Sequence, residues 1–496
     1  MSPPTPQQQQ QHVTPDQAVE IGLQHHRNGN LREAEAIYRK VLAAQADHPA
    51  ALHWLGVIAR ETGHEDDALK LLERSFQLNP RDPFTRQDMG ETMSSLGRFA
   101  EAEQHYLAAL AIMPQSAAIL NDLSVVYHKM RRYDDALATV DRALAIQPDL
   151  PQAHSNRGMA LTDRGRFDEA IAALDQSLRL RPNHRPTQLS KARALFLRGD
   201  LPPAFELYEL RFGQGEIPYP TLAEPMWDGR ADVSGKTVLV VSEQGAGDTI
   251  HFARYATMLR RERGCDVILI CLADVKPLLM TLGGGVRILG SGEDRPKFDY
   301  HVPILSLPRI FGTTLETIPC EVPYLSADPA RVAKWRERFA AEARPKVGMV
   351  WAGSTTHKSD RNRSMPLATL APLLAMNEVA WFSLQKGPPA GQITQTPNAP
   401  LDLAPDLHDY ADTAAAIETL DLVITVDTSV AHVAGALARP VWTMLSHEGE
   451  WRWTRARADD SPWYPTMRLY RQPTPGDWGA VIDRVAREVR QLRRPT

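Results

Sequence analysis

Two segments in the C-terminal half of the sequence combine polar side chains with a turn from a strand into a helix. In the later segment the β-branched run Leu422–Val426 stops at Asp427, and Thr428 and Ser429 follow before a helical pattern begins. Asp, Thr and Ser are preferred helix N-caps, and the free N–H groups at such a helix start attract phosphate. We therefore predict an anion-binding turn here, with His432 one helical turn further on.

The earlier segment follows the run Val238–Val241 and contains two glycines, Gly245 and Gly247, before Asp248 and His251. Glycine allows a sharp turn and a close approach of a ligand to the backbone. Asp248 falls at the start of the next helix, and His251 lies one turn later on the same face. The pattern fits two interpretations, a helix-capping aspartate beside structural glycines, or a carboxylate at a binding turn.

A third segment is basic and begins with the small-residue turn Trp351–Ser354 at the end of another strand. Lys358, Arg361 and Arg363 follow it, just before a predicted helix start at Ser364. Cations after the carboxyl end of a strand, where open α/β sheets bind ligands, favour a diphosphate clamp. A solvated basic loop is the alternative interpretation.

Two further features have open interpretations. Gln385 and Lys386 end the run Ala380–Leu384, where they would contact a nucleotide or serve only the fold. The loop from His447 to Pro465 contains three tryptophans and a tyrosine. These rings either pack as core between two lobes or form a wall for a sugar or a base.

Bulk properties exclude several classes of protein. The net charge is −4, so no basic field indicates nucleic acid. The three cysteines match no disulfide framework and no common zinc pattern, which favours a reducing compartment. The polar, glutamine-rich start lacks the apolar core of a signal peptide, and no apolar run reaches the ~20 residues of a membrane helix. We predict a cytoplasmic protein without a membrane span, with residues 1–14 as a disordered leader.

The N-terminal half is an array of 34-residue units. Small residues and prolines recur at that step, in columns that include Ala34, Ala68, Ala102, Ala136, Ala170 and Ala204, and Pro80, Pro114, Pro148 and Pro182. The period and these columns resemble tetratricopeptide repeats. We count five repeats and a partial sixth in residues 15–212. Such arrays form a groove that captures a polypeptide; self-association or plain scaffolding is the alternative.

The remainder of the chain alternates strands and helices. Residues 213–235 are rich in proline and turn residues and are predicted to be a linker. Seven buried-strand runs follow, at 238–241, 267–271, 286–289, 347–351, 380–384, 422–426 and 441–445. Strands that alternate with helices imply parallel sheets. We expect an N-terminal lobe over 236–327 and a C-terminal, nucleotide-sugar-binding lobe over 328–496, which ends in a closing helix at 477–493.

Two Rossmann-like lobes resemble the glycosyltransferase B fold. The Gly247-Asp248 turn with His251 looks like the first motif of ADP-heptose:lipopolysaccharide heptosyltransferases, and Asp427, Thr428 and His432 are similar to that family's donor-diphosphate motif. The resemblance implies that Asp248 is the general base and that Gly247, Arg363, Lys358, Asp427, Thr428, Ser429 and His432 bind the donor, with His251, Arg361, Gln385 and Lys386 as further candidates. Glu243 and Gln244 depart from the family's serine-rich approach to the first turn.

The order of repeats and transferase resembles that of O-GlcNAc transferases, whose groove carries an asparagine ladder. The matching positions here are Trp54, Asp88, Asp122 and Asn156, which make a more acidic groove. The chain contains no Asp-x-Asp triplet, the usual metal ligand of many glycosyltransferases. We therefore expect a metal-independent, inverting glycosyltransferase without a cofactor beyond its nucleotide-sugar co-substrate, acting on a protein acceptor held by the repeats. The alternatives are a heptosyltransferase-like enzyme of cell-surface glycan assembly and a non-catalytic adaptor.

Overall fold

The computed structural model describes residues 13–212, 219–355 and 360–492. Contacts divide the chain into two compact units. Unit 1 comprises the residues up to Arg164 together with Ala172–Pro182, and unit 2 comprises Gly165–Ile171 and everything from Asn183 onward. Most of the predicted leader, part of the predicted linker and the end of the predicted closing helix lie outside the described residues.

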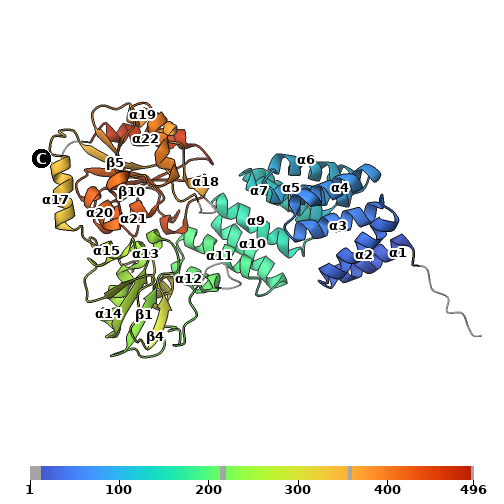
Figure 1. Cartoon of the computed structure of the whole chain (residues 1–496), viewed down its shortest axis with the longest axis horizontal. Helices are drawn as coiled ribbons and strands as arrows, with labels where there is room; N and C mark the ends of the chain where they lie inside the picture. Colours follow the sequence, from blue (N-terminus) through green and yellow to red (C-terminus); the bar gives the residue numbers. More distant parts are fainter. Residues whose placement is uncertain (1–12, 213–218, 356–359, 493–496) are drawn as a thin grey trace, which may run out of the picture. The chain divides into compact units, whose positions relative to one another are not determined.

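Antiparallel helix pairs build the first part of the chain (Figure 1). They are α1 (Pro15–Arg27), α2 (Leu31–Ala44), α3 (Pro49–Glu61), α4 (Glu65–Leu78), α5 (Pro83–Ser95), α6 (Phe99–Ile112), α7 (Ala117–Lys129), α8 (Tyr133–Ile146), α9 (Pro151–Asp163), α10 (Phe167–Leu180), α11 (Arg185–Arg198) and α12 (Leu201–Tyr208). Proline opens many of them at a position where its missing N–H costs nothing.

The sequence columns explain the spacing of the helices. Ala34, Ala68 and Ala102 are fully buried, and a Cβ on Gly56 would lie 2.9 Å from Leu72. Small side chains therefore let the two helices of a repeat approach each other. Glycines in the turn column adopt positive φ, and Arg131, which replaces glycine in that column, adopts φ 62° as well. The turn geometry is thus kept where the residue type changes.

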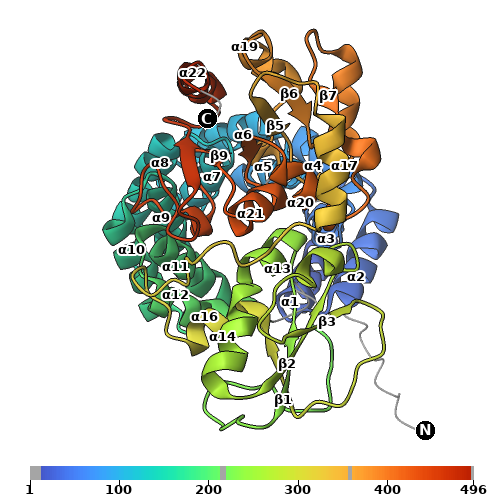
Figure 2. The same ribbon diagram turned by 90° about the vertical axis from the view of Figure 1, so that its left-hand side faces the viewer.

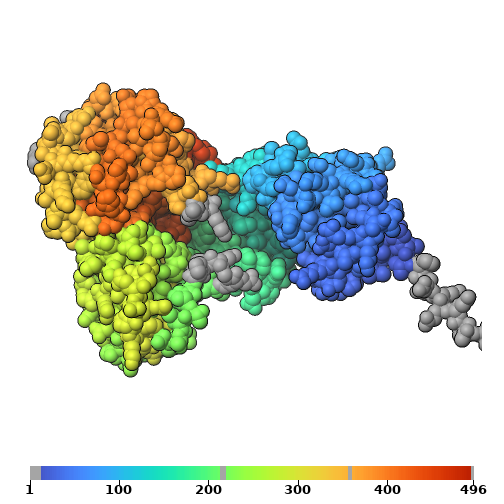
Figure 3. Space-filling view, in the orientation of Figure 1, coloured from blue at the N-terminus to red at the C-terminus, as the bar shows by residue number. Residues whose placement is uncertain are grey.

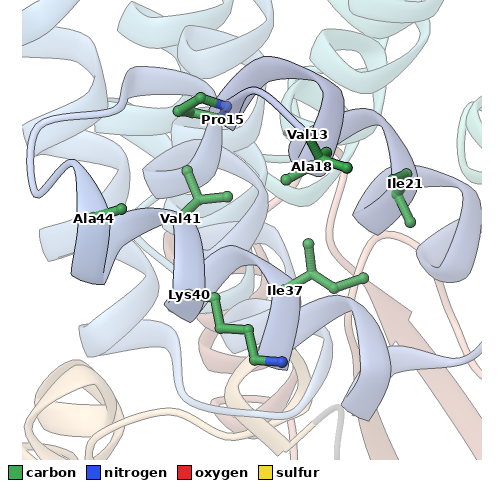
Figure 4. A pocket seen from close by; sticks show the side chains of 8 residues that line it. All are labelled: Val13, Pro15, Ala18, Ile21, Ile37, Lys40, Val41 and Ala44. Carbon is green, nitrogen blue, oxygen red and sulfur yellow. The ribbon is translucent and has the colours of Figure 1, made fainter. Parts of the chain in front are cut away.

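An apolar pocket of about 290 Å³ lies between α1 and α2 at the first described helix pair (Figure 4). Val13 and Ile21 are about half exposed there. The lining residues are Val13, Pro15, Ala18, Ile21, Ile37, Lys40, Val41 and Ala44. In a solenoid each helix pair is covered by its neighbour, so this is the face that a preceding pair would cover.

Unit 2 contains two parallel sheets. The first has the order β3-β2-β1-β4 and the second β10-β9-β8-β5-β6-β7. The strands are β1 (Thr237–Val241), β2 (Asp266–Cys271), β3 (Arg287–Gly290), β4 (Tyr300–Pro303), β5 (Lys346–Val350), β6 (Ala380–Ser383), β7 (Leu401–Asp402), β8 (Leu422–Val426), β9 (Val441–Leu445) and β10 (Met467–Arg471). Strands β4, β7 and β10 were absent from the sequence prediction.

Helices cover the sheets and join them. They are α13 (Ala246–Phe252), α14 (Arg254–Arg263), α15 (Lys276–Leu279), α16 (Leu307–Ile310), α17 (Pro329–Arg338), α18 (Asp360–Arg363), α19 (Ala371–Leu374), α20 (Tyr410–Glu418), α21 (Ser429–Ala436) and α22 (Trp478–Val489). In Figure 1, α19 and α22 cover one face of the second sheet, and α20 and α21 cover the other. The two lobes meet along a continuous seam (Figure 3).

Helices α11 and α12 belong to unit 2 rather than to the repeat unit. Leu195, Phe196 and Phe205 share one hydrophobic core with β1 and with α13 of the first lobe. Trp227, in the segment predicted as a linker, is buried in the same core, and its backbone N–H donates to the His301 carbonyl at 2.8 Å. The α/β part is therefore built around the last helix pair as well as around its own strands.

Candidate functional site

Each sheet reverses its strand order at one point. In the second sheet β5, β6 and β7 follow one another toward one edge, and β8, β9 and β10 follow one another toward the opposite edge. The strand order therefore reverses between β5 and β8. Open α/β sheets bind ligands outside the carboxyl ends of the strands at such a switch point. The turn after β5 contains Gly353, and the turn after β8 contains Asp427, which places the basic segment and the later strand-to-helix turn beside each other.

The first strand-to-helix turn reaches the same place from the other lobe. Helix α13 packs on α21, and the two lie side by side in both ribbon views (Figures 1 and 2). A Cβ on Gly247 would lie 3.1 Å from Cδ2 of His432 and 3.4 Å from Cα of Ser429. A larger side chain would fit only if the ring of His432 moved by a few tenths of an ångström. The structure brings Gly247 and Asp248 of the first lobe against Ser429 and His432 of the second.

Asp248 is held at this junction by two different contacts. One carboxylate oxygen, Oδ2, accepts a hydrogen bond from the N–H of Gly245 at 3.2 Å, which caps α13. The other oxygen pairs with the guanidinium of Arg452, and that guanidinium also pairs with Glu450. Burial and the charge of Asp427 raise the pKa of Glu450 well above its ordinary value. Asp248 and Glu450 thus contact the same guanidinium, from different lobes.

A buried aromatic cluster lies next to the contact between Asp248 and Arg452. Asp427 accepts a hydrogen bond from the indole N–H of Trp453 at 2.8 Å, and Trp453 stacks on His432 at 5.2 Å. The Nδ1 atoms of His432 and His251 are 3.1 Å apart, and the hydroxyl of Tyr464 is within hydrogen-bond distance of both. Of the two interpretations of the aromatic loop, packing as core between the lobes matches this arrangement.

Burial decides the charge of the two histidines. It lowers the pKa of His432 to about 3, helped by the nearby charge of Arg254, and it lowers the pKa of His251 well below the ordinary value. Both rings are therefore neutral at pH 7. In this structure they pack the α13–α21 junction and supply no positive charge to a phosphate.

The basic segment contributes one enclosed guanidinium. Nε of Arg363 lies 3.5 Å from a carboxylate oxygen of Asp360, its side chain is 19% exposed, and Nε has no hydrogen-bond partner among the described residues. A Cβ on Gly353, in the turn after β5, would lie 2.7 Å from Nη2 of Arg363, so the guanidinium lies at the switch point. Arg361 is exposed, and Lys358 lies outside the described residues.

The remaining predicted residues have structural partners. Gln385 accepts hydrogen bonds from the N–H groups of Trp351 and Ala352, at 3.1 and 2.9 Å, and so holds the turn after β5. Lys386 donates to the carbonyl of Leu407. Ser429 accepts from the Tyr410 hydroxyl at 2.9 Å. The hydroxyl of Thr428 lies 3.1 Å from that of Thr425.

Sequence reasoning missed Arg452, Glu450 and Arg471. Arg471 ends β10, donates to the Trp453 carbonyl at 2.6 Å, and interacts with the charge of Asp427. No short motif marks these residues, because the loop after β9 brings Glu450 and Arg452 to the site across the fold, and Arg471 reaches it from the end of β10. The only available signal was the loop itself, in which charges alternate with tryptophans.

The last helix pair fixes that loop. The ring of Trp451 stacks on Phe196 of α11 with centroids 4.4 Å apart, and the guanidinium carbon of Arg452 lies 4.2 Å from the centroid of the Trp451 ring. The Arg455 N–H and the Thr454 hydroxyl both donate to the Leu197 carbonyl at 2.9 Å. The position of Arg452 against Asp248 therefore depends on α11.

A second arrangement of interest lies in unit 1. Side chains 35 positions apart pair along successive repeats: His53 with Asp88, Gln87 with Asp122, and Asn121 with Asn156, at 2.7, 2.7 and 2.8 Å. The ladder positions Asp88, Asp122 and Asn156 are thus each hydrogen-bonded to the preceding repeat. Burial raises the pKa of Asp122 to about 6, and although burial opposes it, hydrogen bonds to Asp82 and Asp88 raise the pKa of His53 to about 9.

Comparisons with known proteins support the repeats. The family described as "Tetratricopeptide repeat" matches residues 94–158 and 151–184, and "Anaphase-promoting complex, cyclosome, subunit 3" matches residues 27–109. The N-terminal part of the chain is a tetratricopeptide-repeat array. Solved structures similar to it include Pseudomonas aeruginosa PilF (18% identity, 40% of this chain and 90% of that chain, TM-score 0.36) and TTC0263 from Thermus thermophilus (23%, 37% and 100%, TM-score 0.34).

One curated relative extends beyond the repeats. The chain is 27% identical over 327 residues to protein FlbA of Caulobacter vibrioides, a match that covers 60% of this chain and 54% of FlbA. The human cell division cycle protein 16 homolog is 22% identical over 127 residues, 24% of this chain and 20% of that protein. The chain thus spans about half the length of FlbA. None of the helices in the described ranges has the length and apolarity to cross a membrane.

Proposed function

We propose that unit 2 is a glycosyltransferase of the B-fold type, which transfers a sugar from a nucleoside-diphosphate donor to an acceptor hydroxyl with inversion and without a metal. The observation that carries the proposal is the convergence of two strand-to-helix turns from different sheets. Gly247 contacts Ser429, so Asp248 of one lobe faces the switch point of the other. A two-lobed transferase needs a proton acceptor on one lobe and a phosphate cradle on the other.

The cradle is supplied by charge and by backbone. The turn after β8 presents the first N–H groups of α21, an eight-residue helix that begins at Ser429. Arg363 comes from the neighbouring switch-point strand β5, and Arg452 approaches from the loop after β9. Preorganised charge of this kind stabilises a leaving diphosphate and is usually the largest catalytic contribution. Asp248 would accept the proton of the acceptor hydroxyl, an effect of about 10²–10⁴-fold.

The repeat array would hold a polypeptide acceptor. Its ladder carboxylates, Asp88 and Asp122, are bonded by His53 and Gln87 of the preceding repeats, and Glu91 pairs with Arg60 at 2.7 Å. The proposal of a polypeptide acceptor therefore rests on the repeat groove itself and not on a net acidic surface.

The second candidate function is a non-catalytic adaptor, which one observation favours: both oxygens of Asp248 already have partners. A carboxylate paired with a guanidinium is a weak base. The two functions differ in whether unit 2 binds a donor at all.

The test is a thermal-shift screen of the full chain with UDP-, GDP-, ADP- and CMP-sugars. A ligand at 100 times its dissociation constant stabilises the folded state by about 2.7 kcal/mol. A shift with one nucleotide class, followed by turnover that Asp248→Asn abolishes, supports the transferase. If no nucleotide sugar shifts the unfolding of unit 2, the proposal fails and the adaptor is favoured.

A further inference from the structure

Arg452 stands out among the charged groups of unit 2. Its side chain is 8% exposed, it pairs with Asp248 from the other lobe and with Glu450 from its own loop, and its Nε has no hydrogen-bond partner among the described residues. Burial lowers its pKa to about 10, so it is charged at pH 7. A guanidinium with five donors is therefore only partly satisfied where the two lobes meet.

Two arginines and three acidic residues surround the turn after β8. Arg452 and Arg363 are gathered there with the carboxyl groups of Asp248, Glu450 and Asp427. Arg363, like Arg452, has an Nε without a hydrogen-bond partner in the described chain. Guanidinium groups bind phosphate through paired N–H donors. Two incompletely bonded guanidinium groups beside a switch point are the donor set that a diphosphate requires.

We propose that Arg452 is a diphosphate ligand. In the free protein its guanidinium is paired with Asp248 and Glu450; when a nucleoside diphosphate binds, the guanidinium pairs with the phosphates instead, and Asp248 is released. The inference rests on the proposed function and adds an order to it: the donor binds first, and the proton acceptor becomes competent only afterward. In the free protein the ion pair keeps Asp248 from acting as a base, and it also gives the buried guanidinium a counter-charge.

The exchange predicts opposite effects for the two partners of the ion pair. Removal of the guanidinium removes a phosphate contact, so diphosphate affinity falls. Removal of the Asp248 charge removes the competitor for that guanidinium, so diphosphate affinity rises even though turnover is lost. A purely structural ion pair predicts another result, because either change would disturb the lobe junction and weaken binding.

The experiment titrates the full chain with UDP, GDP, ADP and inorganic pyrophosphate by calorimetry. Variants are R452A, R452K and D248N, with R457A as the matched control, since Arg457 is in the same loop but pairs with exposed Asp460 and is 46% exposed. For the diphosphate that binds wild type best, we expect R452A to weaken affinity by about tenfold or more, the size of a charged hydrogen bond. We expect D248N to strengthen affinity several-fold and R457A to leave it within about twofold.

The outcomes separate the two proposals. If wild type binds none of the four probes, the proposed function fails and this inference fails with it. If wild type binds a diphosphate but D248N binds it equally or more weakly, the exchange is wrong while the transferase proposal stands. Should R452A not fold, R452K, which keeps the charge and loses the paired donors, must still weaken binding, and D248N must still strengthen it.

Discussion

Gly247 is the position at which the junction of the two lobes can be tested most directly. An added Cβ would lie 3.1 Å from the ring of His432, closer than an ordinary contact. That ring cannot move aside easily, because it stacks on Trp453 at 5.2 Å and lies 3.1 Å from the Tyr464 hydroxyl. We therefore expect substitutions at Gly247 to separate α13 from α21 or to strain the cluster beneath them.

The size of the effect follows from two opposed contributions. Alanine within a helix is favoured over glycine by about 0.5–1 kcal/mol, whereas overpacking costs about 1–3 kcal/mol. Gly247→Ala should therefore destabilise unit 2 by about 1 kcal/mol net, and Gly247→Val, with two more methyl groups, by about 2–4 kcal/mol. The control is Gly245→Ser, because a Cβ on Gly245 has only the Asp248 carboxylate within 4 Å, at 3.6 Å.

Urea unfolding followed by tryptophan fluorescence is the appropriate assay. Of the 10 tryptophans only Trp54 lies in unit 1, so the other nine report on unit 2. The expected order of stability is wild type and G245S, then G247A, then G247V. If G247V unfolds at the same urea concentration as wild type, the junction can relax freely, and the argument that Gly247 fixes Asp248 against the second lobe is wrong.

Three further predictions concern other parts of the chain. The pKa of His53 is about 9 in the folded protein and 6.5 ordinarily. Protonated His53 therefore stabilises the fold fully below pH 6.5, and this stabilisation is lost as the pH rises through 9. Thermal unfolding followed by circular dichroism should show a contribution of at most about 3 kcal/mol, and His53→Gln should remove this pH dependence. Trp451→Ala should lower turnover and diphosphate affinity by releasing the Arg452 loop from Phe196, and Trp451→Phe should restore much of both. Glu243→Gln should cost about 1.5–3 kcal/mol in urea unfolding, the size of a charged hydrogen bond, because buried Arg211 loses one of its two carboxylate partners and keeps Glu209 at 2.9 Å, whereas the exposed pair of Lys70 should be dispensable.

Local patterns predicted the elements of the fold well. The seven strand runs all form strands, with ends within about one residue, because continuous β-branched runs bounded by turns suit a buried parallel sheet. Strand β10 was missed because its sequence, Met-Arg-Leu-Tyr-Arg, alternates like an exposed edge strand, which is its place in the sheet. The repeat array was predictable because one structural unit is repeated in register.

The site was only partly predictable. Asp427 was identifiable because it follows β8 directly, and Asp248 because it lies in the first turn of the helix after β1, so chain direction alone places both beyond the carboxyl ends of strands. Arg452 and Glu450 were not, because their positions depend on a long loop anchored by Trp451 on α11, a contact between distant parts of the sequence. The neutral state of His432 also required the structure, since burial and not sequence determines it.

Glu243 stands where heptosyltransferases have a serine-rich approach to the first turn, and the structure explains this difference. The first sheet reverses its strand order between β1 and β4, where a second ligand crevice would be expected. Glu243 occupies this position. Its carboxylate accepts hydrogen bonds from the N–H groups of Ile304 and Leu305, at 3.0 and 3.3 Å, and pairs with Arg211 at 2.9 Å. Gln244 next to it donates to the Tyr208 hydroxyl of α12 at 2.8 Å. The first turn is thereby fixed to the last helix pair, as the loop of Arg452 is through Trp451. Both halves of the Asp248–Arg452 contact are held by α11 and α12, so these two helices are structural components of the candidate site rather than the end of a separate tether.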